Sequence, residues 1–189
     1  MPTTSKLIIL DRDGVINVDS AEFIKSPAEW KPIAGSIEAI ASLNRAGYRV
    51  VVATNQSGIG RGLFDMATLM AINDKMVEMV FRQGGRIDAV FFCPHTAGEN
   101  CQCRKPNTGM FTDIAARFKV GLAGVPTIGD SLRDLQAGAA VGCLPILVLT
   151  GKGKKTSQHE ALPPGTRVFA NLAEAVRQLV SEVALGMRA

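Results

Sequence analysis

The stretch Leu7-Ile8-Ile9-Leu10-Asp11-Arg12-Asp13-Gly14 decides the fold, because four apolar residues run directly into two aspartates. A short continuous apolar run is typical of a buried strand. Asp11 and Asp13 are two residues apart, so in an extended chain both carboxylates face the same side, and Gly14 allows a sharp turn. Two carboxylates this close repel each other unless a hard cation lies between them. The stretch therefore predicts a buried strand that ends in an acidic, cation-binding site suited to phosphoryl chemistry.

The composition is that of a globular protein, with 189 residues of which 47% are hydrophobic and 20% charged. We expect residues 1–189 to form a single domain with a sizeable core. The formal net charge of +4 suits an anionic substrate. Aromatic residues make up only 5% and no basic stripe runs between them, so we expect no nucleic-acid partner. No secretory signal or membrane-spanning run is visible, and we expect a cytoplasmic protein without a membrane partner.

Strand-like and helix-like segments alternate along the chain, which is typical of a parallel sheet covered by helices on both faces. The predicted strands cover residues 7–10, 48–53, 89–92, 125–128, 146–149 and 167–169, and the predicted helices cover 35–47, 109–119, 131–141 and segments that begin at 65 and 172. Ser36 is the expected N-cap of the first helix and Gly47 its stop. The methionines of the second helix are expected to fill the core. Residues 151–165, rich in Gly, Lys and Pro, are expected to form a mobile loop.

Polar side chains follow four predicted segments at the edge where ligands of such sheets bind. They are Asp11, Asp13, Thr54, Asn55, Gln56, Ser57, Lys105 and Asp130. Taken singly, each is weak evidence, since an aspartate after a strand is often a helix cap and a lysine usually lies at the surface. Their meeting at one edge indicates an active site.

The same residues resemble a known family. Asp-Arg-Asp-Gly, then Thr54, Lys105 and Gly129-Asp130, are similar to the four motifs of haloacid dehalogenase superfamily phosphatases, over about residues 7 to 150. More narrowly, residues 54–62 and the Cys-Pro-His and Cys-x-Cys-Arg-Lys-Pro segments resemble the heptose bisphosphate 7-phosphatase family. Histidinol-phosphatases, which share the first motif and the metal loop, are the nearest alternative. The resemblance implies a doubly wound, mostly parallel, Rossmann-like α/β fold.

The resemblance also implies a Mg²⁺-dependent mechanism through an aspartyl-phosphate. Asp11 is the implied nucleophile and Asp13 the implied acid/base, with Mg²⁺ held by Asp11, the Asp13 backbone carbonyl and Asp130. Thr54 and Lys105 would stabilise the transferring phosphoryl group. The implied substrate contacts are Asp19, Ser20, Ala21, Glu22, Thr54, Asn55, Gln56, Ser57, Arg104, Lys105 and Ser131. The implied substrate is heptose 1,7-bisphosphate, on the route to ADP-heptose for bacterial surface polysaccharide.

Three cysteines and a histidine lie close together in one predicted loop. Cys93, His95, Cys101 and Cys103 offer three thiolates and one imidazole, a complete set for a closed tetrahedral Zn²⁺ site. Four protein ligands leave no open position, so the zinc is predicted to be structural and to staple the loop beside Lys105. The fourth cysteine precedes an apolar strand and is expected to be buried and inert, while His159 is expected at the surface.

The spacing of the motifs leaves no room for a cap domain. Asp11 and Thr54 are 43 residues apart and Thr54 and Lys105 are 51 apart, which is enough only for the helices and strands of the sheet. We therefore expect a capless, open site. We also expect a monomer that takes a phosphorylated sugar.

Two residues depart from the family pattern. Val15 stands where the family often has threonine, and Ser131 follows Asp130 where relatives often carry lysine. An alternative of another class is a catalytically inactive zinc-binding interaction module built on the same scaffold. Such a module would have no reason to keep both aspartates of the first motif, and Asp11 and Asp13 are both present.

Overall fold

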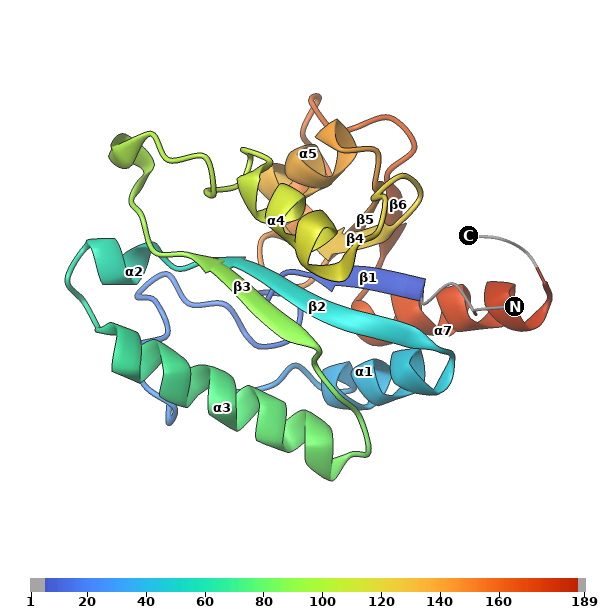
Figure 1. The fold of residues 1–189 in the computed structure, drawn as a ribbon, viewed down its shortest axis with the longest axis horizontal. Coiled ribbons are helices and arrows are strands. Elements are labelled where there is room, and N and C mark those ends of the chain that lie inside the picture. Colours follow the sequence, from blue (N-terminus) through green and yellow to red (C-terminus); the bar gives the residue numbers. More distant parts are fainter. Residues whose placement is uncertain (1–5, 187–189) are drawn as a thin grey trace.

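Strand β1 (Lys6–Leu10) lies near the centre of a six-stranded sheet in the computed structural model, which describes residues 6–186 (Figure 1). The other strands are β2 (Tyr48–Asn55), β3 (Ala89–Cys93), β4 (Pro126–Gly129), β5 (Leu144–Val148) and β6 (Arg167–Phe169). Their order is β3-β2-β1-β4-β5-β6, and each pairing of neighbours is parallel. This is the order of doubly wound dinucleotide-binding sheets, so the predicted fold class is confirmed.

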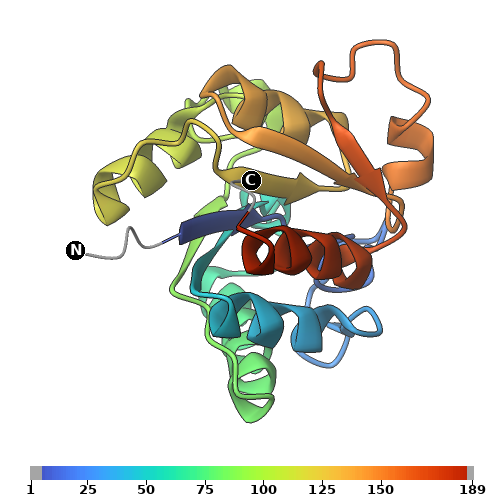
Figure 2. The same ribbon diagram turned by 90° about the vertical axis from the view of Figure 1, so that its right-hand side faces the viewer.

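Helices cover both faces of the sheet, as Figures 1 and 2 show. One face carries α1 (Ser36–Arg45), α3 (Met66–Arg82) and α7 (Leu172–Ala184), and the other carries α4 (Gly109–Phe118) and α5 (Leu132–Ala140). Three single-turn elements lie in loops, namely α2 (Ser57–Gly60), η1 (Ala97–Glu99) and α6 (Gly153–Thr156). Within residues 6–186, no helix combines the length and apolarity needed to cross a bilayer.

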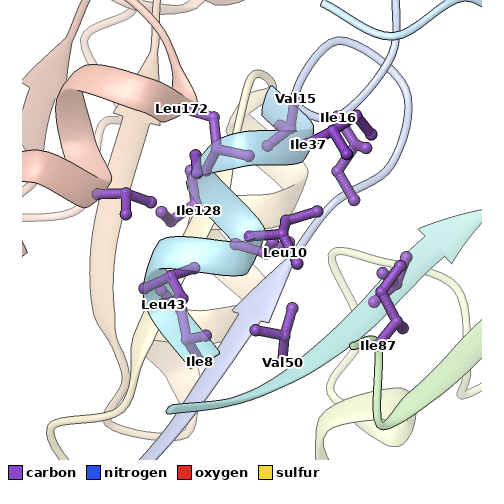
Figure 3. Packing of buried hydrophobic residues seen from close by; sticks show 14 of the residues in the cluster. Ile8, Leu10, Val15, Ile16, Ile37, Leu43, Val50, Ile87, Ile128 and Leu172 are labelled. Atoms are coloured by element: carbon purple, nitrogen blue, oxygen red, sulfur yellow. The ribbon is translucent and has the colours of Figure 1, made fainter. Parts of the chain in front are cut away.

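The apolar run of β1 is buried on both faces because it lies inside a parallel sheet. Ile8 and Leu10 point into the cluster that packs under α1 and α7, where Leu43 and Leu172 meet them (Figure 3). Leu7 and Ile9 point to the opposite side, where the core includes Phe111 and Ile114 of α4. This alternation fixes the register of β1, so the residues after Leu10 leave the sheet at a defined position.

The helix signals in the sequence are partly confirmed. Asp65 caps α3, since its carboxylate accepts a hydrogen bond from a backbone N–H of the first turn at 2.8 Å. The prediction that Ser36 is an N-cap is wrong, because Gly35 takes that position with a left-handed φ of 80°. Ser36 instead donates its hydroxyl to the Ile16 carbonyl at 2.6 Å, which ties the loop after β1 to α1.

The methionines of α3 do not all fill the core. Met76 is buried with Leu69 and Val80, whereas Met70 is 49% exposed. Only one stripe of α3 faces the sheet, and Met70 follows Leu69 by one residue, about 100° round the helix axis. The prediction of Met70 as core filler is therefore wrong.

The loops at the carboxyl ends of the strands carry no cap domain. Between β1 and α1 the described chain forms only isolated bridges, between Asp13 and Asn17 and between Asn17 and Pro32, which agrees with the predicted capless fold. The segment after β5, expected to be a mobile loop, begins with α6 and is anchored. Its Thr156 is buried and donates its hydroxyl to the Asp130 carbonyl at 2.8 Å. That expectation is wrong for the first turn of the segment, because this turn packs against the end of β4.

Candidate active site

Most of the predicted catalytic and substrate-binding residues meet at one cavity of about 340 Å³ beyond the carboxyl ends of the strands. In chain order, β2 and β3 are added on one side of β1, whereas β4, β5 and β6 are added on the other. Ligands of open parallel sheets bind at such a switch point, which here lies between β1 and β4. The predicted residues that line the cavity are Asp11, Asp13, Asp19, Ser20, Ala21, Thr54, Asn55, Gln56, Ser57, Arg104 and Lys105. Glu22 and Ser131 are not among its lining residues, and Ser131 instead caps α5. Asp130 is buried and is not among the lining residues, and its carboxylate lies with those of Asp11 and Asp134.

Asp11 and Lys105 form the floor of this cavity. Asp11 follows β1 directly, and its backbone N–H donates to the Ile128 carbonyl of β4 at 2.9 Å. Lys105 is 2% exposed, and its Nζ lies 2.9 Å from Asp11 Oδ1 and 2.7 Å from Asp134 Oδ1. The ammonium also donates to the Ala53 carbonyl at 2.6 Å. A buried cation is thus fixed beside the carboxylate of Asp11 by three oxygen partners.

The floor still holds more negative than positive charge. Oxygens of Asp11, Asp130 and Asp134 lie within 4.8 Å of one another, and all three residues are buried. Burial and the neighbouring Asp134 raise the pKa of Asp11 to about 6 against the pull of Lys105, and burial with Asp11 and Asp134 raises the pKa of Asp130 to about 7. Burial opposes ionisation of Asp134 too, but Lys105 and Arg133 outweigh it and lower its pKa. Crowded oxygen donors short of a counter-charge fit a divalent cation such as Mg²⁺.

The carboxylate of Asp13 is held apart from this cluster. It accepts hydrogen bonds from Arg12 Nε at 3.2 Å, Asn17 Nδ2 at 2.9 Å and Gln56 Nε2 at 2.8 Å. Arg12 is itself fully buried and donates from Nη1 to Asn73 of α3 at 3.1 Å. Asp13 therefore presents a carboxylate held in one orientation at the cavity wall.

Strand β2 runs two residues further than predicted and so carries Thr54 and Asn55 into the site. Thr54 is buried at the cavity wall, where its hydroxyl accepts a hydrogen bond from Gln56 Nε2 at 2.9 Å. The Asn55 side chain donates to the Lys105 carbonyl at 3.0 Å and accepts from the Lys105 N–H at 3.1 Å. Asn55 thereby fixes the backbone that carries the buried lysine.

A second cluster of metal-binding residues lies next to the cavity. Cys93 Sγ is 3.5 Å from Cys101 Sγ, Cys101 Sγ is 3.5 Å from Cys103 Sγ, and His95 Nδ1 is 3.3 Å from Cys103 Sγ. A tetrahedral zinc ion with Zn–S bonds of about 2.3 Å holds its sulfurs about 3.8 Å apart, so the four donors fit Zn²⁺ without an open position. Arg104 Nη1 donates to the His95 carbonyl at 3.1 Å, which links the cluster to the cavity wall.

Five cavity-lining side chains were not expected from the sequence. They are Phe23, Ile24, Arg61, Arg133 and Lys152. Lys152 follows β5, and its backbone N–H donates to Asp130 Oδ2 at 2.7 Å while its Nζ pairs with Asp19 at 2.8 Å. Extending the search for polar residues to the end of the fifth strand would have found it. The guanidinium of Arg61 lies 5.9 Å from the Phe23 ring centroid, a pairing between two loops that no local pattern signals.

Known proteins resemble the chain over nearly its whole length. A family profile described as polynucleotide kinase 3 phosphatase matches residues 6–133, and one described as HAD-hydrolase-like matches residues 102–175. The chain is 58% identical over 177 residues to D-glycero-beta-D-manno-heptose-1,7-bisphosphate 7-phosphatase of Bordetella bronchiseptica, covering 94% of this chain and 99% of the relative. The enzyme of the same name from Pseudomonas putida is 50% identical over 175 residues, with 93% and 99% covered.

Solved structures agree with the sequence relatives. The crystal structure of the D,D-heptose 1,7-bisphosphate phosphatase from B. bronchiseptica, complexed with magnesium and phosphate, matches with a TM-score of 0.92 at 58% identity. That match covers 94% of this chain and 99% of the other. Between the two phosphatase families suggested by the sequence, the findings confirm the first. The chain belongs to the haloacid dehalogenase-like hydrolases and, within them, to the D-glycero-beta-D-manno-heptose-1,7-bisphosphate 7-phosphatase family.

Proposed function

We propose that the chain is a phosphatase that removes the 7-phosphate of D-glycero-beta-D-manno-heptose 1,7-bisphosphate. The observation that carries the proposal is the buried group of Asp11, Lys105, Asp130 and Asp134 at the switch point of the sheet, in a chain so similar to enzymes of that name. Residues 1–189 act as one phosphatase domain that serves heptose supply for surface polysaccharide. A reducing cytoplasm suits its four free cysteines.

In the first step Asp11 is the nucleophile. Its carboxylate oxygen attacks phosphorus, the bond to the sugar 7-oxygen breaks, and an aspartyl-phosphate forms. Lys105, 2.9 Å from the attacking carboxylate, and the Thr54 hydroxyl stabilise the charge on the transferring group. Bound Mg²⁺, held by Asp11, the Asp13 backbone carbonyl and Asp130, supplies the positive charge that lets a carboxylate approach an anionic phosphoryl group.

Asp13 moves the proton in both steps. It donates a proton to the leaving sugar oxygen, which departs as the neutral hydroxyl. It then removes a proton from the water that attacks the aspartyl-phosphate, so that inorganic phosphate leaves and Asp11 is regenerated. The hydrogen bonds from Asn17 and Gln56, at 2.9 and 2.8 Å, hold the Asp13 carboxylate in one orientation for both transfers.

Selectivity resides in the walls of the cavity. Ser57 and residues 19–21 line the cavity and would contact the sugar, while Arg104 would offer a guanidinium to the phosphate that is not hydrolysed. Binding this remote group positions the reacting phosphate, so a bisphosphate should have a higher kcat/KM than heptose 7-phosphate or histidinol phosphate.

The test is phosphate release by Asp11→Asn, with Asp113→Asn, at an exposed position of α4, as the matched control. Asp11→Asn keeps the shape of the side chain but removes the nucleophile, so turnover should fall by several orders of magnitude while the control stays near wild type. Asp13→Asn should also lower turnover, because it removes the group that carries the proton in both steps. Near-native activity of Asp11→Asn with Mg²⁺ would contradict the mechanism, and equal efficiency on histidinol phosphate would contradict the substrate.

A further inference from the structure

Arg133 lines the cavity, and its side chain makes no hydrogen bond or salt bridge among residues 6–186. Its side chain is half-buried, and its Nε is buried without a hydrogen bond in this part of the chain. The other cations of the cavity each have a neighbour. Lys105 and Lys152 pair with aspartates, Arg104 donates to a backbone carbonyl, and the guanidinium of Arg61 lies 5.9 Å from the Phe23 ring centroid. Arg133 acts on Asp134 through its charge, but its guanidinium N–H groups remain available to bind a ligand.

The position of Arg133 is unfavourable for a cation on structural grounds. It is the second residue of α5, after the N-cap Ser131, and a helix N-terminus carries partial positive charge that disfavours a cation. A buried donor without an acceptor adds a further cost. Arg49 also has a buried Nε without a hydrogen bond, but its guanidinium lies 4.7 Å from the Phe118 ring centroid, and this cation–π contact compensates part of the cost. An anion in the cavity would relieve both costs at Arg133.

We propose that Arg133 binds the phosphate of the substrate that is not hydrolysed, and so is a specificity-determining residue for a bisphosphate. This inference rests on the proposed function. The buried floor made by Asp11 and Lys105 is the place for the reacting phosphate, whereas Arg133 lies half-buried on the wall and reaches the rest of the substrate. A guanidinium is suited to this role because two of its N–H groups match two phosphate oxygens.

Arg133 and Arg104 come from different segments of the chain. Arg104 belongs to the loop after β3 and Arg133 to the helix after β4, and both line the same cavity. Two guanidinium groups would neutralise a phosphate dianion more fully than Arg104 alone, and would tie its position to two elements of the fold.

The experiment compares kcat/KM for heptose 1,7-bisphosphate and heptose 7-phosphate in wild type, Arg133→Met and Arg133→Lys. Arg117→Met, an exposed arginine on α4, is the matched control. Arg133→Met should lower kcat/KM for the bisphosphate by about 10- to 100-fold, mainly through KM, as expected for loss of hydrogen bonds to a charged group. The value for the monophosphate should fall much less. Arg133→Lys should recover part of the loss, because it restores the charge but not the two-pronged geometry.

The outcomes separate the possible roles. An equal loss on both substrates would overturn the inference, because it would mean that Arg133 acts only by supporting the ionised Asp134 and Lys105 near the reacting centre. Unchanged discrimination between the two substrates would overturn it as well. A wild-type chain that fails to hydrolyse the bisphosphate would instead overturn the proposed function, and this inference with it.

Discussion

Replacing Lys105 by methionine should destabilise the protein more than the same replacement at an exposed lysine. The side chain keeps its length, but Asp11 and Asp134 lose the ammonium that lies 2.9 and 2.7 Å from their carboxylates, and the Ala53 carbonyl loses its donor. Removing one partner of a buried ion pair costs about 3–5 kcal/mol, because the remaining charge is left uncompensated. In a chain of this size each kcal/mol shifts Tm by about 2–4 °C, so we expect a fall of about 6–20 °C.

The assay is thermal and urea unfolding in the presence of a chelator, with exposed Lys154→Met as the control. A second variant, Lys105→Met combined with Asp134→Asn, removes one of the two carboxylates that the loss of Lys105 leaves without a counter-charge. It should be more stable than Lys105→Met alone, and a comparison that also includes Asp134→Asn alone measures the coupling between the two side chains. If Lys105→Met unfolds at the wild-type temperature and urea concentration, the carboxylates do not depend on this lysine and the reasoning is refuted.

Three further predictions follow from the same structure. The purified chain should hold about one Zn²⁺, and Cys101→Ser should lose it, as metal analysis would show; burial raises the pKa of Cys143 to about 12, so this thiol should resist alkylation even after zinc is removed. In protein freed of metal by a chelator, burial and the neighbouring carboxylates raise the pKa of Asp130 from 3.8 to about 7. Between these two pH values the folded state therefore binds a proton that the unfolded state does not bind. The free energy of unfolding should therefore fall as pH rises from about 4 to 7, and Asp130→Asn should flatten that slope in urea titrations. Gly14→Ala should lose stability and activity, because its Cβ would lie 2.1 Å from Asp130 Oδ2, whereas Gly84→Ala, with a similar positive φ and open space, should show only the backbone cost in the same assays.

The sequence predicted the sheet and its active edge because both depend on local signals. A buried parallel strand is a continuous apolar run, and the polar residues that follow it are displayed at its carboxyl end by construction. The sequence alone therefore predicts a strand at residues 7–10 and an acidic site at the aspartates that follow it. The zinc cluster was readable for a similar reason, since Cys93 to Cys103 keep their four donors within one loop.

The predictions from sequence were wrong or incomplete where contacts between distant segments determine what a side chain does. Ser36 is a good N-cap by type, but its hydroxyl is used by the Ile16 carbonyl, twenty residues away in the chain. Lys152 lies in a segment whose composition is typical of a loop, and only its contacts with Asp130 and Asp19 bring it to the site. Arg133 gives no signal at all in one sequence, because nothing local distinguishes an arginine that faces a cavity from one that faces solvent.

The charges of the cavity are divided between its floor and its walls. Asp11, Asp130 and Asp134 give the floor a negative excess that Lys105 alone does not balance, while Arg104 and Arg133 make parts of the wall positive. A phosphate ester is attracted by the wall but repelled by the floor, where the nucleophile must reach it. A divalent cation at the floor removes that repulsion, and the phosphate in turn adds oxygens for the cation. Metal and substrate should therefore strengthen each other's binding, and the modest net charge of +4 conceals a strongly polarised site.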